Sequence, residues 1–148
     1  MRTRHSSLAI AFAAVAVAMV GLVRPANASV NLGLGADWIE DGVDEFNLTL
    51  GADTFLARRL SLGGRAGVAF FDDSHHLGIP IDFRLKLHVQ HIYFEGLAGP
   101  WMLIDSGDLF RFHGAFGFGL ESGGLGFGLE VGRLGRATML GLRFAFRL

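Results

Sequence analysis

Hydrophobic and polar residues alternate with a period of two along most of the chain, and the alternation is clearest in roughly the last 40 residues. From Phe110 to Glu121 the even positions carry phenylalanine, leucine and one glycine. The odd positions carry arginine, histidine, alanine, glycine and glutamate. Successive side chains of a strand point to opposite faces, so this period predicts strands with one large apolar face and one face of glycine and charge.

The same alternation extends back to Val30 and predicts eight strands. Their length is near the ~9–11 residues that a tilted membrane-spanning strand needs. An even number of strands places both chain ends on one side of a barrel. The expected strands are 30–38, 44–55, 60–70, 79–89, 92–101, 110–121, 125–132 and 139–148.

The fifth strand is the place where the pattern slips. Its apolar residues begin on the face of Ile92 and Phe94 and then change to the face of Leu97 and Trp101. One extra residue in a strand reverses its faces, so we expect a β-bulge near Gly96.

The connections and aromatic residues suggest an inner and an outer rim. We expect short inner turns and mostly longer outer loops. Trp38 and Trp101 would form an outer aromatic girdle, with Tyr93, Phe144 and Phe146 near the inner rim. The inner turns are 56–59, 90–91 and 122–124, and the outer loops are 39–43, 71–78, 102–107 and 132–137.

The positions of the charges decide between a membrane barrel and a soluble one. A soluble barrel of the lipocalin kind is apolar inside and polar outside. Here the apolar face of the predicted strands carries no charge, so a soluble barrel would have to bury all the charges of the other face. In lipid they pair in a narrow lumen, and six acids with six bases predict a closed, salt-bridged interior. They are Asp37, Asp53, Asp82, Glu95, Glu121, Glu130, Arg65, Arg84, Lys86, Arg111, Arg143 and Arg147.

On these residues the chain resembles the small eight-stranded outer-membrane β-barrels of Gram-negative bacteria. The resemblance covers the predicted mature chain and includes the apolar last strand, 142–148, although such strands commonly end in an aromatic residue and this one ends in Leu148. It implies an all-β, eight-stranded antiparallel up-and-down transmembrane β-barrel. Its implied partners are outer-membrane lipid, lipopolysaccharide and the outer-membrane insertion machinery, and we expect a monomer. No motif identifies a particular family.

The first 28 residues predict a cleaved signal peptide, which leaves residues 29–148 as the barrel domain. Arg2 and Arg4 precede an apolar run, 8–23, and small residues at 26–28 suit a signal peptidase. The run is shorter than the ~20 residues of a membrane-spanning helix.

The mature chain that this cleavage leaves has a negative balance. It loses three of the thirteen basic residues and keeps all fourteen acidic ones. A chain of this charge is a poor match for nucleic acid. It also has no cysteine, so a thiol nucleophile and a thiolate metal site are excluded.

His113, with Glu121 or Glu130, is the first candidate for a hydrolase site. The resemblance brings in lipid A deacylases, which place a serine two residues after a histidine on one strand. Here that position is Ala115, and Ser122 lies at the far end of the strand. A base needs its nucleophile within hydrogen-bond reach. We therefore expect His113 to be a polar lumen residue and predict no catalytic residue.

A metal site is the second candidate. Asp72, Asp73, His75 and His76 form the densest set of metal ligands, on a predicted outer loop. Carboxylates and imidazoles together could hold a divalent cation. A solvated loop tip is polar without any metal, so both interpretations stay open and no cofactor is predicted.

The remaining candidates carry little weight. His88 is expected in the lumen and His91 at a turn. The glycine-rich runs 117–119 and 124–128 lack the lysine or the strand-to-helix setting of a phosphate loop. We expect their inward glycines to make room for arginine and glutamate side chains.

The sequence thus predicts an exported outer-membrane barrel with a structural or surface-interaction role and no catalysis. A lipid A-modifying acyl hydrolase and a narrow channel for ions or small solutes are the alternatives.

Overall fold

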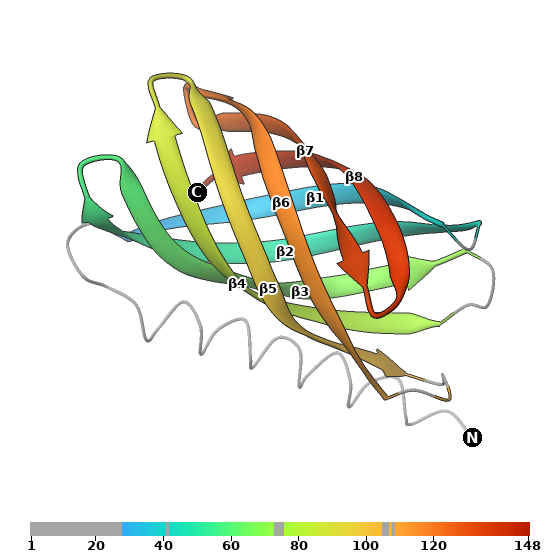
Figure 1. Ribbon diagram of the computed structural model, residues 1–148. Coiled ribbons are helices and arrows are strands. Elements are labelled where there is room, and N and C mark those ends of the chain that lie inside the picture. Colours follow the sequence, from blue (N-terminus) through green and yellow to red (C-terminus); the bar gives the residue numbers. More distant parts are fainter. Residues whose placement is uncertain (1–27, 41, 73–75, 105–106, 108) are drawn as a thin grey trace.

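The computed structural model is a closed barrel of eight antiparallel strands (Figure 1). It describes residues 28–40, 42–72, 76–104, 107 and 109–148. Each strand pairs with its neighbours in sequence, and the first pairs with the last, which closes the sheet. The predicted fold class is confirmed. The strands are β1 (Ala28–Ile39), β2 (Val43–Ala57), β3 (Leu60–Phe71), β4 (Leu77–Val89), β5 (Ile92–Ile104), β6 (Phe110–Ser122), β7 (Leu125–Leu134) and β8 (Ala137–Arg147).

The predicted signal peptide lies outside the described residues, apart from Ala28. That residue begins β1 and pairs with Thr54. Within the described part of the chain, no helix is long and apolar enough to cross a membrane.

One end of the barrel, the terminal end, carries the first residue of β1 and the last residue of β8. Three two-residue turns lie at this end, at Arg58–Arg59, Gln90–His91 and Gly123–Gly124. Both glycines of the last turn have positive φ, 60° and 84°. Positive φ at both central residues is the type I′ requirement, which suits the twist of a hairpin.

The opposite end, the loop end, carries the connections 40–42, 72–76, 105–109 and 135–136. Three of them are longer than the two-residue turns of the terminal end, as predicted. The expected loop at 132–137 is wrong, because β7 continues to Leu134 and β8 begins at Ala137. The residues left between these strands form a tight turn with Gly135 at φ 63°.

The predicted bulge near Gly96 is also wrong. Pairing between β5 and β6 runs without a shift from Ile92 to Met102, and Trp101 keeps the inward register. Trp101 and Tyr93 are buried in the lumen, so neither belongs to an aromatic girdle. The register instead shifts in β2, between Phe55 and Ala57. The bulge was predicted because the apolar residues of β5 change from one face to the other in the sequence. The strand keeps its register, and its lumen-facing residues change from polar to apolar along its length.

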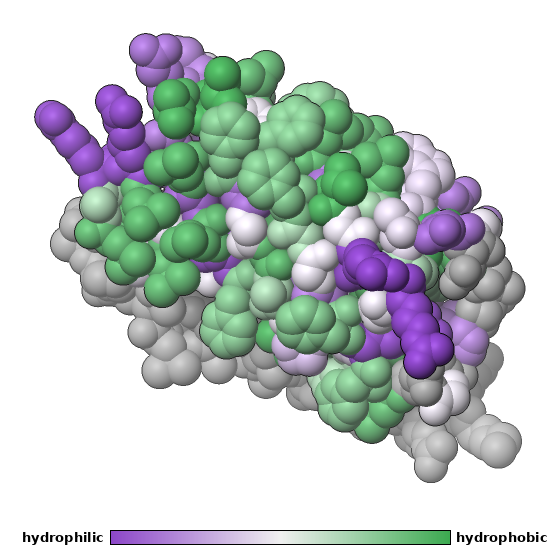
Figure 2. All heavy atoms as spheres, viewed as in Figure 1, coloured by the Kyte–Doolittle hydropathy of each residue, from purple (hydrophilic) through white to green (hydrophobic). Residues whose placement is uncertain are grey.

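The two faces of the wall differ as the charge pattern predicted. Large apolar side chains point outward, and Phe83, Phe112 and Phe116 are 70%, 66% and 55% exposed. Figure 2 shows them as a broad hydrophobic surface with hydrophilic side chains toward both ends. Most of the predicted lumen charges are buried, while Lys86, Arg111 and Glu121 are half-buried and Arg147 is exposed. The buried ones are Asp37, Asp53, Asp82, Glu95, Glu130, Arg65, Arg84 and Arg143.

Candidate functional site

The lumen holds a network of ion pairs, and Glu130 of β7 lies at its centre. Its carboxylate accepts two parallel bonds from Arg65 of β3, at 2.9 and 3.0 Å. It also accepts bonds from Nε and Nη2 of Arg143 in β8, at 3.1 and 2.9 Å. Glu130 has no exposed surface. Because β3 and β7 are four strands apart in a ring of eight, the contact between Arg65 and Glu130 spans the lumen.

Asp82 of β4 extends this network toward β5 and β6. One carboxylate oxygen accepts a bond from Nε of Arg65 at 2.9 Å. The other accepts a bond from the Trp101 indole at 3.2 Å and lies 2.7 Å from Nδ1 of His113. The second ring nitrogen of His113 lies 3.4 Å from Glu130 without hydrogen-bond geometry. His113 is therefore enclosed between two carboxylates, with no exposed surface.

Two acids from β1 and β2 adjoin the same network. Asp37 lies 2.7 Å from Nη2 of Arg143, and the Asn47 amide donates to Asp37 at 2.8 Å and to Glu45 at 3.3 Å. Oε1 of Glu45 is buried and has no hydrogen-bond partner among the described residues. This corner is thus the least satisfied part of the network. We call Asp37, Arg65, Asp82, His113, Glu130 and Arg143 the charged layer.

A separate ion pair lies nearer the terminal end. Arg84 of β4 donates from Nε to Asp53 of β2 at 2.9 Å, and its Nη2 binds the second oxygen of that carboxylate. Asn31 donates to Asp53 at 3.1 Å, and Glu95 lies 4.0 Å from Arg84. This pair lies between the charged layer and the terminal end, where Asp53 and Arg84 also line a recess.

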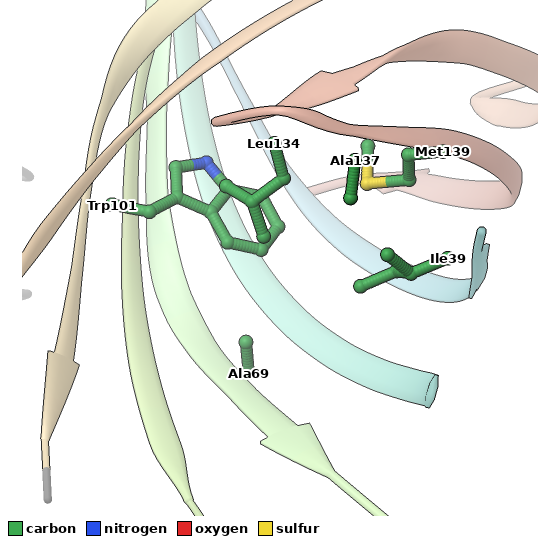
Figure 3. Packing of buried hydrophobic residues seen from close by; sticks show 6 residues of the cluster. All are labelled: Ile39, Ala69, Trp101, Leu134, Ala137 and Met139. Carbon is green, nitrogen blue, oxygen red and sulfur yellow. The ribbon is translucent and has the colours of Figure 1, made fainter. Parts of the chain in front are cut away.

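Toward the loop end the lumen lining becomes apolar. Figure 3 shows side chains from β1, β3, β5, β7 and β8 pointing into one space, with the Trp101 indole against Leu134. Val43 and Phe71 pack against them. We call this cluster the apolar plug, and because the Trp101 indole also binds Asp82, it is joined to the charged layer. The plug consists of Ile39, Ala69, Trp101, Leu134, Ala137 and Met139.

Toward the terminal end the lumen opens into a polar recess of about 30 Å³. Lys86 and Arg147 both bind the carboxylate of Glu121 there, at 2.7 and 2.8 Å. A volume of ~10–15 Å³ is needed for one water molecule. The recess therefore has room for water.

Ser61 and His88 form a contact in this recess that the sequence interpretation missed. The Ser61 hydroxyl lies 3.2 Å from Nε2 of His88, and the Phe55 ring packs on the imidazole at 5.3 Å between centroids. A nucleophile–base pair is normally completed by a third group that orients the base. Among the described residues, no carboxylate is hydrogen-bonded to His88. The only signal in the sequence was that both residues face inward on neighbouring strands.

The structure does not assemble the hydrolase candidates. His113 is enclosed in the charged layer, and Ala115 also faces inward on β6. Ser122 ends β6 at the terminal end, nine residues from His113, which corresponds to roughly 30 Å of strand. Glu121 lies near Ser122 in the polar recess, and Glu130 binds two arginines.

Part of the candidate metal loop lies outside the described residues. Asp73 and His75 are not described, whereas Asp72 and His76 are. In the described ranges, no group of three histidine, aspartate or glutamate side chains is placed to hold a metal ion.

Comparison with known proteins gives similarity in structure only. No protein-family model matches the chain, and a search of the curated proteins finds no match. A designed transmembrane β-barrel aligns over 85% of this chain and all of its own, with a TM-score of 0.67 and 13% identity. The outer-membrane enzyme PagL aligns over 80% of this chain and 99% of its own, with a TM-score of 0.63 and 12% identity.

A second designed barrel, TMB2.3, aligns over 82% of this chain and 94% of its own, with a TM-score of 0.55 and 18% identity. This chain has the fold of a transmembrane β-barrel. At these identities the similarity concerns the fold, and the chemistry of the site has to be argued from the chain's own residues.

Proposed function

We propose that the chain is an outer-membrane β-barrel of a Gram-negative bacterium, with a structural or surface-interaction role, no catalysis and a lumen that does not conduct. The terminal end faces the periplasm and the loop end faces the exterior. The observation that carries the proposal is the contact between Arg65 and Glu130, which crosses the lumen with both partners buried.

The outward face supports a lipid environment. Soluble monomers rarely expose a contiguous apolar surface larger than a few hundred Å², yet large apolar residues are exposed on all eight strands of the wall. The interior supports a closed lumen. The charged layer fills its middle and the apolar plug fills its loop end, so an ion entering from the terminal recess meets bound side chains.

Planar bilayer recordings test the closed lumen. Folded protein, verified by its heat-modifiable migration on gels, should give no discrete conductance steps. A porin of 16–18 strands, which leaves an aqueous channel, serves as the positive control in the same bilayer. Reproducible steps from the wild-type barrel would contradict the proposal and favour the channel alternative.

A hydrolase remains the second candidate, because the fold resembles that of an outer-membrane enzyme and because Ser61 contacts His88. Mass spectrometry of lipid A from cells expressing the wild type, Ser61→Ala or His113→Ala separates the two functions. We expect the same lipid A masses in all three strains and in cells without the protein. A loss of acyl chains that requires Ser61 would establish the hydrolase instead.

A further inference from the structure

The wall of the barrel, measured along its strands, is shortest at the β7–β8 turn. β7 and β8 are the shortest strands, with 10 and 11 residues. Pairing between β6 and β7 begins at His113, so residues 110–112 of β6 extend past the end of β7. Figure 1 shows β5 and β6 continuing beyond this hairpin. The turn therefore lies beside an exposed strand edge at the border of the apolar surface.

Three arginines belong to this turn and the adjoining strands. Nη2 of Arg133 donates to the carbonyl of Arg136 at 2.9 Å, so its guanidinium folds across the turn. The stem of Arg111 lies on Gly135, where an added Cβ would be 3.6 Å from Cδ of Arg111. Arg133 and Arg136 are exposed and Arg111 is half-buried. Arg111 and Arg133 thus both contact the turn that carries Arg136, Arg111 from the lumen register of β6 and Arg133 from the outward register of β7.

One described carboxylate adjoins the cluster. Glu40, in the β1–β2 connection, accepts a bond from the backbone N–H of Thr138 at 3.2 Å. Hydrogen bonds from Thr138 lower the pKa of the Glu40 carboxyl, and the charge of Arg133 contributes less. No described carboxylate lies within 4.0 Å of the three guanidinium groups. The described groups around the turn therefore carry an excess of positive charge.

The cluster lies directly beside exposed apolar side chains. Phe110 and Phe112 of β6 are 60% and 66% exposed, and Leu140 of β8 is 47% exposed. The Gly135 N–H donates to the Phe112 carbonyl at 2.7 Å, which fixes the turn against this part of β6. Figure 2 shows hydrophilic side chains over the turn bordered by hydrophobic ones. A molecule that binds here would contact guanidinium groups and aromatic rings together.

We propose that Arg111, Arg133 and Arg136 bind the phosphate group of a lipid whose acyl chains lie against Phe110, Phe112 and Leu140. Guanidinium groups bind phosphate oxygens through paired N–H bonds. The apolar neighbours distinguish a phosphorylated lipid from free phosphate, because only the lipid can cover them. The proposal rests on the proposed location in a membrane and adds the chemistry of the lipid that this wall selects.

The test measures lipid binding by native mass spectrometry of the full chain, folded in a neutral detergent. Bisphosphorylated lipid A is the probe, and its phosphate-free analogue and inorganic phosphate are the two comparison ligands. EDTA is present throughout, so a bridging divalent cation cannot supply the contact. The triple variant Arg111→Ala/Arg133→Ala/Arg136→Ala is compared with Arg58→Ala/Arg59→Ala, which removes two exposed arginines at the terminal end.

We expect the triple variant to bind bisphosphorylated lipid A at least about tenfold more weakly than the wild type. The Arg58/Arg59 variant should bind like the wild type, and both comparison ligands should bind weakly. Equal losses in the two variants, equal binding of the phosphate-free lipid, or no binding of bisphosphorylated lipid A by the wild type in EDTA would each overturn the proposal.

A heat-modifiable gel shift keeps this test separate from the proposed function. If the wild type shows no such shift, the membrane-barrel proposal itself fails. If the wild type and the triple variant both show the shift and bind the lipid equally, only the phosphate-binding inference fails.

Discussion

The charged layer and the apolar plug lie next to each other in one lumen but are stabilised differently. In the charged layer each group depends on named partners, and Glu130 alone accepts four bonds from two arginines. In the plug the side chains are held together by van der Waals contact and the exclusion of water. The Trp101 indole also donates a hydrogen bond to Asp82. Removing one partner from the charged layer should therefore leave a buried charge without its counter-charge. Truncating a side chain of the apolar plug should leave a cavity.

Replacing Glu130 with glutamine should produce the largest effect. Arg65 and Arg143 would remain buried without their shared counter-charge, and removing one partner of a buried ion pair costs about 3–5 kcal/mol. Urea unfolding in detergent micelles, followed by tryptophan fluorescence, measures the loss. Glu121→Gln in the open recess is the control and should cost about 0–1 kcal/mol. Equal losses in the two variants would contradict the distinction between the charged layer and the recess.

Truncating Met139 in the plug should have the next largest effect. Met139 has no exposed surface, and a buried methionine replaced by alanine typically costs about 2–5 kcal/mol because a cavity remains. Met102 of β5 has the outward register and provides the matched control, with a smaller expected loss. The same urea titration applies. A greater loss at Met102 would mean that the plug is not a packed core.

The contrast between the layers also explains where interpretation of the sequence failed. The number of strands and most of the inward and outward positions could be predicted from the alternation. In most strands the lumen-facing residues are polar or glycine and the outward-facing residues are apolar. In β5 the inward residues change from Tyr93 and Glu95 to Leu97, Trp101 and Leu103 as the strand enters the plug. The outward residues between them begin with Gly96, Ala98 and Pro100, which are small. The apparent slip therefore marked the boundary between two layers.

Partners across the lumen could not be predicted from alternation either. The pattern gives the face of each residue but not the register at which the barrel closes. Arg65 and Glu130 are 65 residues apart and meet only because the closure of β1 on β8 places β3 opposite β7. Likewise, Ser61 and His88 could be matched only once the register of β3 with β4 was known.

Inward glycines provide a smaller test of how tightly the charged layer is filled. A Cβ added to Gly35 would lie 2.7 Å from Nη1 of Arg143, whereas one added to Gly96 on the outer wall meets no described atom within 4 Å. Gly35→Ala should cost about 1–3 kcal/mol through overpacking. Gly96→Ala should cost nothing or stabilise slightly, since glycine weakens a strand. Urea midpoints of the two variants check this, and equal costs would contradict a crowded lumen.

Glu45 should respond in the opposite direction to Glu130, with the smallest change. It is buried beside Asp37, the Asn47 amide is its only hydrogen-bond donor among the described residues, and its second oxygen has no partner there. A neutral amide of the same shape avoids a buried carboxylate next to another carboxylate. Glu45→Gln should therefore raise the free energy of unfolding by up to about 1 kcal/mol, in the urea titration used for Glu130→Gln. A loss as large as that of Glu130→Gln would show instead that the Glu45 carboxylate is paired with a cation, and that the charged layer extends further toward the loop end.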